Sequence, residues 1–258
     1  MSLALSAGST IFADLVYSTS YLTGGYDTSS GTSVVSWTPS AGSNNTYWYM
    51  TVNPSNGNVY EVNGVNGPAE SVLEITPSGS AVTSWNSYGT TILTGSGGIA
   101  SAPNGNIYLF GVSGVYEFTA SGVTVASFDS GLNSGTGAGS IAISPVSPYN
   151  LYVLTSYGSY PYEGGSISEL SPSGAPVTSW YGAGTGFGNF NNPQALAVGP
   201  NGNVFVTDYS NNLVQEFDQN GNFLSQWTVS GPEGIAVAAN GDVYVSSEGN
   251  RSIMVFGP

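Results

Sequence analysis

The chain of 258 residues lacks cysteine and histidine, and its one basic side chain, Arg251, stands against fifteen acidic ones. Without cysteine, disulfides, thiolate nucleophiles and cysteine-ligated metals are excluded. Without histidine, the commonest general base and metal ligand is missing. The absence of lysine also removes Schiff-base chemistry. The net charge of −14 excludes nucleic acid as a partner, because phosphate binding needs clustered lysine and arginine.

Charge of either sign is scarce, at 6% of residues, while 40% are hydrophobic and 12% aromatic. This composition predicts a large folded core. Because ion pairs contribute little with one cation, protonating the carboxylates should cost little stability and relieve their repulsion. We therefore expect adaptation to acidic surroundings, with a fold that survives a pH of about 2 to 3 as well as neutral pH.

Apolar runs are too short to span a membrane, so no membrane insertion is expected. The start, MSLALSAGSTIFADL, lacks the basic residues of a signal peptide. We expect an extracellular or cell-surface protein whose secretion signal lies outside these residues.

A hydrophobic, small, hydrophobic triplet recurs, each time followed by a turn and a run that carries an aromatic residue. The aromatic residues are spaced by 48, 48, 44, 53 and 39 positions, which gives six units of about 43 residues. A repeat of this size decides the fold. The triplets are LAL (3–5), MTV (50–52), IAS (99–101), IAI (141–143), LAV (196–198) and IAV (235–237).

Within a unit the runs are short, β-branched or aromatic, and separated by Asn-Gly or Ser-Gly turns, which predicts four antiparallel strands and no helix. The small residue inside each triplet fits six inner strands that converge on an axis. The sequence therefore predicts an all-β, six-bladed β-propeller of four-stranded antiparallel blades, as a single domain over 1–258. The predicted blades are 1–45, 46–94, 95–136, 137–192, 193–230 and 231–258.

The last predicted blade has no outer strand before Pro258, which leaves an open edge. We expect this edge to support self-association or to accept a strand from a partner.

A glutamate stands eleven positions before a tryptophan or phenylalanine in four units, at Glu74, Glu117, Glu169 and Glu216. The other two units have Tyr26 and Val255 at this position, so we interpret the glutamates as scaffold, bonded to backbone or water. The aromatic residues that end the pattern are interpreted as wedges between blades. They are Trp37, Trp85, Phe128, Trp180 and Trp227.

The segments PNGNVFVTDYSNNLVQEFDQNGNFLSQW (200–227) and PEGIAVAANGDVYVSSEGNRSIMVF (232–256) resemble NHL repeats, a propeller family whose members are often six-bladed. The resemblance implies an ectodomain or adhesion module. It also implies an alternative, a metal-dependent enzyme of the lactonase type with carboxylates and asparagine around a divalent ion at the channel mouth. Glu233, Asn192, Asp208 and Gln194 are the candidates for that site. Related lyases that rely on histidine are excluded by its absence.

The connections between second and third strands, and between blades, vary in length, and variable loops on a rigid scaffold are where binding sites form. Their tyrosine, tryptophan and amide side chains suit stacking on sugars or packing against a protein. The alternative is that they only replace charge for solubility in acid. The ligand-binding candidates are Tyr47, Trp48, Tyr157, Tyr160, Tyr162, Tyr209, Gln194 and Glu233.

The sequence favours a non-enzymatic binding or assembly module with a protein or glycan partner on this variable-loop face. The alternative is a metal-dependent hydrolase, lactonase-like enzyme or lyase. No catalytic residue and no cofactor is expected, and calcium is the one ion left open, with Glu233, Asn192 and Asp208 as its ligands. Asn44 and Asn250 fit the glycosylation sequon.

Overall fold

The structure is a computed structural model that describes residues 3–5, 10–17, 20–27, 33–37, 48–63, 71–86, 98–111, 114–128, 132, 139–157, 164–182, 186 and 188–258. These ranges contain 23 strands and no helix. Accordingly, nothing helical in them reaches the length and apolarity that crossing a membrane requires.

The strands form six sheets, five with four strands and one with three, and each sheet is one blade. Blade 1 contains β1 (Leu3–Leu5), β2 (Thr10–Tyr17), β3 (Ser20–Asp27) and β4 (Ser33–Trp37). Blade 2 contains β5 (Trp48–Val52), β6 (Val59–Asn63), β7 (Ser71–Ile75) and β8 (Ala81–Asn86). Blade 3 contains β9 (Gly98–Ser101), β10 (Ile107–Gly111), β11 (Gly114–Phe118) and β12 (Thr124–Phe128). Blade 4 contains β13 (Gly139–Ile143), β14 (Leu151–Tyr157), β15 (Gly164–Leu170) and β16 (Pro176–Gly182). Blade 5 contains β17 (Pro193–Val198), β18 (Val204–Asp208), β19 (Leu213–Phe217) and β20 (Phe223–Thr228). Blade 6 contains β21 (Pro232–Val237), β22 (Val243–Ser247) and β23 (Ser252–Phe256).

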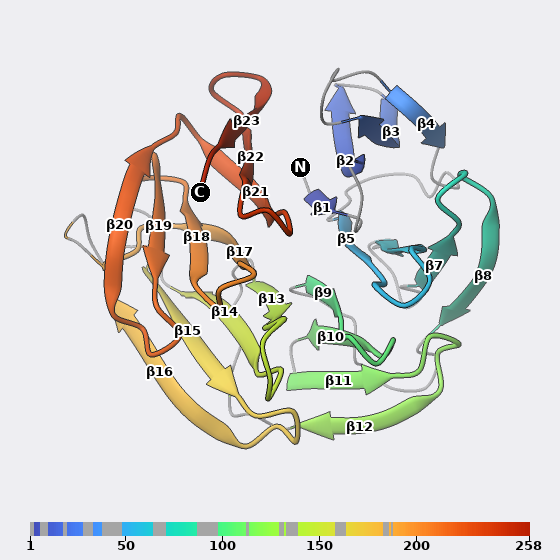
Figure 1. Ribbon diagram of the computed structural model, residues 1–258, viewed down its shortest axis with the longest axis horizontal. Coiled ribbons are helices and arrows are strands. Elements are labelled where there is room, and N and C mark those ends of the chain that lie inside the picture. Colours follow the sequence, from blue (N-terminus) through green and yellow to red (C-terminus); the bar gives the residue numbers. More distant parts are fainter. Residues whose placement is uncertain are drawn as a thin grey trace.

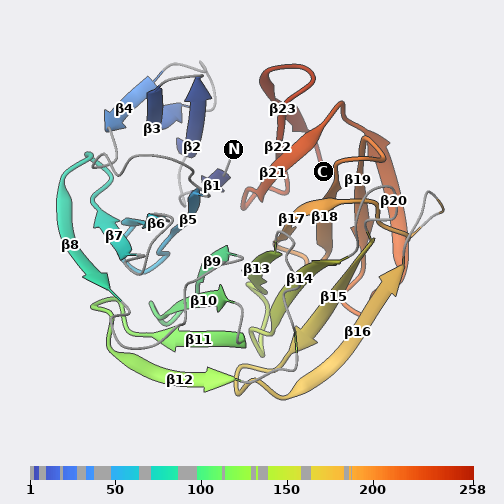
Figure 2. The ribbon, with the colours of Figure 1, turned by 180° about the vertical axis from the view of Figure 1, so that it is seen from behind.

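The blades are arranged as a ring around an axis (Figure 1), and the view from behind shows the same order (Figure 2). The first strand of each blade lies innermost and contacts the first strands of both neighbouring blades, so that β21 meets β1. Every pairing within a sheet is antiparallel and follows chain order. The predicted all-β propeller fold is confirmed, including the three-stranded last blade.

In the described turns of blades 2 to 6, strands 1 and 2, and strands 3 and 4, are joined by short connections that mostly contain a glycine. In blade 5, Gly202 donates its backbone N–H to the Gly199 carbonyl at 2.9 Å, and Gly221 donates to the Asp218 carbonyl at 3.0 Å. Both glycines have positive φ, at 88° and 83°, which other residues adopt at a cost. In blade 4, Tyr149 takes the positive-φ position with φ of 64°. These short turns define one face of the ring, here called the turn face.

The third strands bury both of their faces between neighbouring blades, as their apolar spacing predicts. In blade 5, Val214 and Phe217 are fully buried, and Trp180 from the outer strand of blade 4 packs on Phe217 with ring centroids 6.1 Å apart. Trp85 packs on Phe118 in the same way, at 4.9 Å. The outer-strand tryptophans described by the structure are therefore wedges between consecutive blades.

The repeated glutamates accept hydrogen bonds from side chains, which are partners that the sequence analysis did not predict. Each glutamate lies directly across the sheet from the second-strand aromatic residue, as Glu169 does from Tyr152. Asn150, two residues before that tyrosine, donates its amide to Glu169 at 2.6 Å, and the tyrosine hydroxyl donates to the same oxygen at 3.1 Å. Asparagine donates to the glutamate in blades 2, 3 and 5 as well. The glutamates are scaffold.

Candidate functional site

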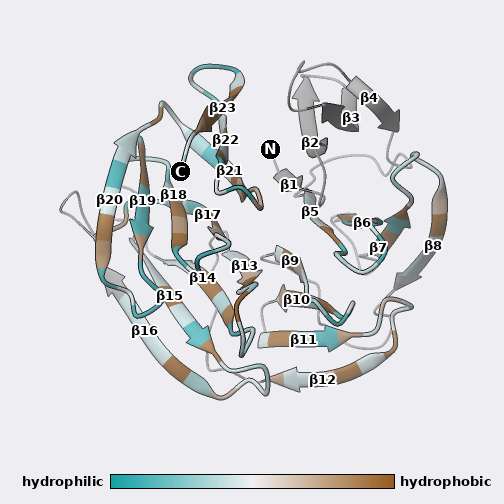
Figure 3. Ribbon diagram, in the orientation of Figure 1, coloured by the Kyte–Doolittle hydropathy of each residue, from teal (hydrophilic) through white to brown (hydrophobic). Residues whose placement is uncertain are grey.

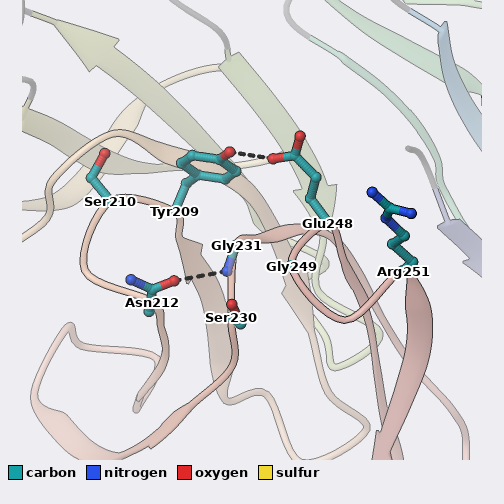
Figure 4. A pocket seen from close by; sticks show the side chains of 8 residues that line it. All are labelled: Tyr209, Ser210, Asn212, Ser230, Gly231, Glu248, Gly249 and Arg251. Carbon is teal, nitrogen blue, oxygen red and sulfur yellow. Dashed lines mark hydrogen bonds between the residues drawn. The ribbon is translucent and has the colours of Figure 1, made fainter. Parts of the chain in front are cut away.

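A pocket of about 530 Å³ lies on the face opposite the turn face, where loops of blades 5 and 6 meet (Figure 4). Three connections build it: the β18–β19 loop, the link from β20 to β21, and the β22–β23 turn. Two of these connections join a second strand to a third strand and one joins two blades. The sequence analysis assigned both types of connection to the variable-loop face. The lining residues are Tyr209, Ser210, Asn212, Ser230, Gly231, Glu248, Gly249 and Arg251.

The pocket is held together by hydrogen bonds between its three connections. The Tyr209 hydroxyl donates to the Glu248 carboxylate across the two blades, and this bond raises the pKa of Tyr209. Asn212 accepts from the Gly231 backbone N–H at 2.8 Å through its side-chain oxygen. The Asn212 carbonyl accepts from the Val229 N–H at 2.9 Å. The walls are therefore fixed before any ligand arrives, which lowers the ordering cost of binding.

Arg251, the lone cation of the chain, lies on the rim of this pocket. It is exposed and adopts φ of 51°, a region that arginine rarely occupies. In the view of Figure 4 its guanidinium lies on the side of Glu248 away from Tyr209. The pocket thus combines an aromatic ring, hydroxyl and amide groups, a carboxylate and a guanidinium, which together donate and accept hydrogen bonds.

Asp208, at the end of β18 beside Tyr209, is fully buried. Its Oδ1 accepts from the Asn191 backbone N–H at 2.8 Å, and its Oδ2 accepts from Asn211 at 2.8 Å and Gln215 at 3.0 Å. Burial raises the pKa of Asp208 to about 6, against the lowering effect of these hydrogen bonds. Gln215 also donates to the Asn189 carbonyl at 2.7 Å. Asp208 therefore fixes the segment before β17 against blade 5.

The predicted channel-mouth residues lie near the starts of the inner strands β17 and β21. Gln194 donates to the side-chain oxygen of Asn192 at 2.6 Å, and Asn192 adopts φ of 58°. The Glu233 carbonyl accepts from Thr207 at 2.6 Å, which ties blade 6 to blade 5. The negative charge of Glu233 also contributes to the raised pKa of Tyr209. Among the described residues, no cluster of three or more acidic side chains is placed to hold a metal ion.

The remaining predicted binding residues divide by position. Trp48 begins β5 and Tyr157 ends β14, but their side chains fall outside the described part of the structure. Tyr47, Tyr160, Tyr162 and the sequon residue Asn44 lie outside the described residues. Asn250 is exposed in the β22–β23 turn. Of the predicted ligand residues whose side chains the structure describes, Tyr209 lines the pocket, and Gln194 and Glu233 do not.

Sequence reasoning missed the other pocket residues, above all Glu248 and Arg251. A signal for Arg251 existed, because a single cation on a predicted loop of a chain this acidic marks a special position. No such signal marked Glu248, which meets Tyr209 from 39 positions away.

The NHL repeat family matches residues 190–217, which cover the segment before β17 through β19. No curated protein sequence matches the chain.

Solved structures share the fold at low sequence identity. Selenomethionine-substituted virginiamycin B lyase from Staphylococcus aureus is 14% identical, with a TM-score of 0.64 over 95% of this chain and 76% of the lyase. A catalytically inactive histidine-to-alanine variant of that lyase with quinupristin is also 14% identical, with a TM-score of 0.58 over 98% and 86%. Regucalcin from Agrobacterium tumefaciens, a calcium-binding protein, is 16% identical, with a TM-score of 0.55 over 81% and 70%. At these identities the likeness shows the fold alone. The chain is therefore an NHL-repeat-like β-propeller.

Proposed function

We propose that the chain is a non-enzymatic binding module that takes a polar ligand, a glycan or a protein surface, in the pocket between blades 5 and 6. The observation that carries this proposal is the pocket itself, built from the variable connections and lined by hydroxyl, amide and charged groups around Tyr209. Such groups match the alternating donors and acceptors of a saccharide, and a tyrosine ring stacks on its apolar face.

The setting proposed for this module is extracellular or surface-exposed, and acidic. The scarcity of charge supports an acidic setting, and so does the raised pKa of the buried Asp208, which is neutral in the folded state below a pH of about 6. The absence of histidine supports the non-enzymatic assignment, since a histidine substitution inactivates the similar lyase.

Glycan-array screening followed by calorimetry tests the proposal. Replacing Tyr209 with asparagine should weaken binding of a captured ligand about tenfold, because stacking and hydrogen-bonding groups at a pocket centre contribute most to affinity. Tyr149→Asn is the matched control, since Tyr149 is 43% exposed but lies on the turn face. Equal losses in both variants would place the ligand elsewhere.

The alternative is a metal-dependent hydrolase, lactonase-like enzyme or lyase with its site at the channel mouth. The fold likeness to a lyase and to a calcium-binding protein favours it. The hydrogen bonds of the candidate ligand Asp208 argue against it. Both of its carboxylate oxygens already accept hydrogen bonds in a fully buried site, where a metal ion would have to replace those donors. Calcium at about 100 times its Kd would raise the free energy of unfolding by about 2.7 kcal/mol. A rise that chelation reverses and Glu233→Gln removes would favour the enzyme.

A further inference from the structure

The outer strands of the first five blades share one irregularity, a β-bulge at the same place. In blade 2, Ile75 pairs with Ala81 and Glu74 with Thr83, so Val82 has no partner across the ladder. The same shift leaves out Val34, Val125, Val177 and Leu224. Bulges of this kind disrupt a sheet edge and prevent another strand from adding to it.

The outermost strand of blade 6 lacks this protection. β23 pairs with β22 in continuous register from Ser252 to Phe256 without a bulge. Its sequence, SIMVF, contains neither charge nor proline, and it is mostly brown in the hydropathy colouring of Figure 3. Among the described residues, no strand pairs with the outer edge of β23. A regular, uncharged edge is the kind to which another strand adds.

The apolar side chains of β23 are also less covered than their counterparts. Ile253 and Phe256 are half-buried, whereas the corresponding Val214 and Phe217 of blade 5, whose strand pairs with β20, are fully buried. Val255 is 54% exposed. Covering these side chains would remove apolar area from water, which is the main driving force of association.

The molecule itself shows what fits such an edge. In the outer strands of blades 2 to 5, an aliphatic bulge residue is followed by threonine, alanine or serine, then by serine or glutamine, then by an aromatic residue. The aromatic residue pairs with a β-branched residue in blades 2 to 5, as Trp85 does with Val72 and Trp227 with Val214. In blade 6 the β-branched residue at this position is Ile253.

We propose that β23 is a docking edge for an extended segment of a partner polypeptide with the outer-strand pattern of aliphatic, small, serine and aromatic residues. The segment pairs antiparallel with β23, its aromatic residue opposite Ile253 and its small residue opposite Val255. Main-chain hydrogen bonds supply affinity and the aromatic position supplies specificity. This goes beyond the proposed ligand pocket, which lies among the loops and does not include β23.

A labelled synthetic peptide with the sequence of residues 79–86, GSAVTSWN, is the probe. Fluorescence anisotropy should show saturable binding to the whole chain, and the same peptide with serine at its tryptophan position should bind at least about tenfold more weakly. Tyr209→Asn should leave peptide binding unchanged. This variant therefore tests the proposed ligand pocket separately from the proposed docking edge at β23.

A chain in which residues 257–258 are replaced by a copy of residues 119–129, TASGVTVASFD, should cover its own edge. Peptide binding should fall at least about tenfold, because the tethered strand acts at a high effective concentration. The matched control carries serine in place of the second valine and the phenylalanine of the copy, and should bind the peptide like the parent chain.

Three results would overturn the proposal. The first is equal affinity for the peptide and its serine version. The second is a control extension that reduces peptide binding as much as the copy of residues 119–129 does. The third is a chain that forms a dimer in sedimentation, loses this dimer on Val255→Lys, and binds no peptide. The third result would assign β23 to a second copy of the chain.

Discussion

Asp242 and Val255 in blade 6 stand where blades 2 to 5 have an asparagine and a glutamate. In blade 4 these positions hold Asn150 and Glu169, joined by a bond of 2.6 Å inside the blade. Both members of the pair change in blade 6, where Asp242 accepts instead from Asn240 at 2.7 Å. The comparison teaches that the asparagine accompanies a largely buried glutamate in blades 2 to 4, whereas blade 6 has the exposed Val255 at the glutamate position and no such bond.

Asp208 and Ser247 make a second comparison between blades 5 and 6. Each ends the second strand of its blade and is buried, opposite Pro193 and Pro232 respectively. Asp208 accepts from a backbone N–H of the preceding segment, and Ser247 donates to the Ser230 carbonyl. The residue at this position therefore holds the segment that leads into the first strand of its blade. In blade 5 this residue is a carboxylic acid that titrates, and in blade 6 it is a serine that does not.

The largest expected loss of stability comes from substitutions in the glycine turns that pack on the outer-strand tryptophans. A Cβ atom at Gly221 would lie 2.6 Å from Trp180 at φ of +83°, whereas nothing lies within 4 Å of one at Gly257. Gly221→Ala should lower the free energy of unfolding by roughly 3 kcal/mol, from backbone strain and overpacking together. Gly257→Ala should change it by less than about 0.5 kcal/mol. Chemical denaturation measures both, and equal losses would contradict the wedge packing.

The next effect follows from Asp208. Its pKa is about 6 in the folded state against an ordinary 3.8, so between these values the folded state binds a proton that the unfolded state does not. The contribution of Asp208 to the free energy of unfolding should therefore rise by about 2 kcal/mol as the pH falls from about 7 to 4, and level off at about 3 kcal/mol near a pH of about 3. Denaturation at several pH values, compared with Asp208→Asn, isolates this gain.

Ser247→Ala is the matched control for this titration. Its difference from the parent chain should not vary over the same pH range, because serine does not titrate there. A parent chain that loses stability relative to Asp208→Asn on acidification would show that the carboxylate is ionised in the fold.

The smallest effect concerns the polar pair. Glu169→Val should lower the free energy of unfolding by about 2 kcal/mol, because Asn150 and the Tyr152 hydroxyl lose their acceptor. Glu169→Gln keeps a hydrogen-bond acceptor and should lower the free energy of unfolding by a smaller amount. Val255→Thr in blade 6 should fall within about 0.5 kcal/mol of the parent. A Glu169→Val variant as stable as Val255→Thr would remove the distinction between the blades.

The blades could be predicted from the sequence because their signals are local. The triplets, the glycine turns and the spacing of Val214 and Phe217 follow from strand periodicity and turn chemistry. The partner of each glutamate could not be predicted, since strand register brings together Asn150 and Glu169, which are 19 positions apart in the chain.

The pocket could be predicted only in part. The variable loops were identified as its face, but which of their side chains meet depends on how two blades pack. Tyr209 was noticed for its aromatic ring, whereas its partner Glu248 became visible only in the folded arrangement.

The wedge tryptophans have an optical consequence. The indole nitrogens of Trp85, Trp180 and Trp227 are buried without a hydrogen-bond partner in the described part of the chain. Each of these indole rings packs on a phenylalanine of the next blade. Indole emission shifts to the red when the ring meets water. Chains that keep one of these tryptophans would therefore report, as a colour change, the parting of blades 2 and 3, 4 and 5, or 5 and 6, and so the order in which the ring opens.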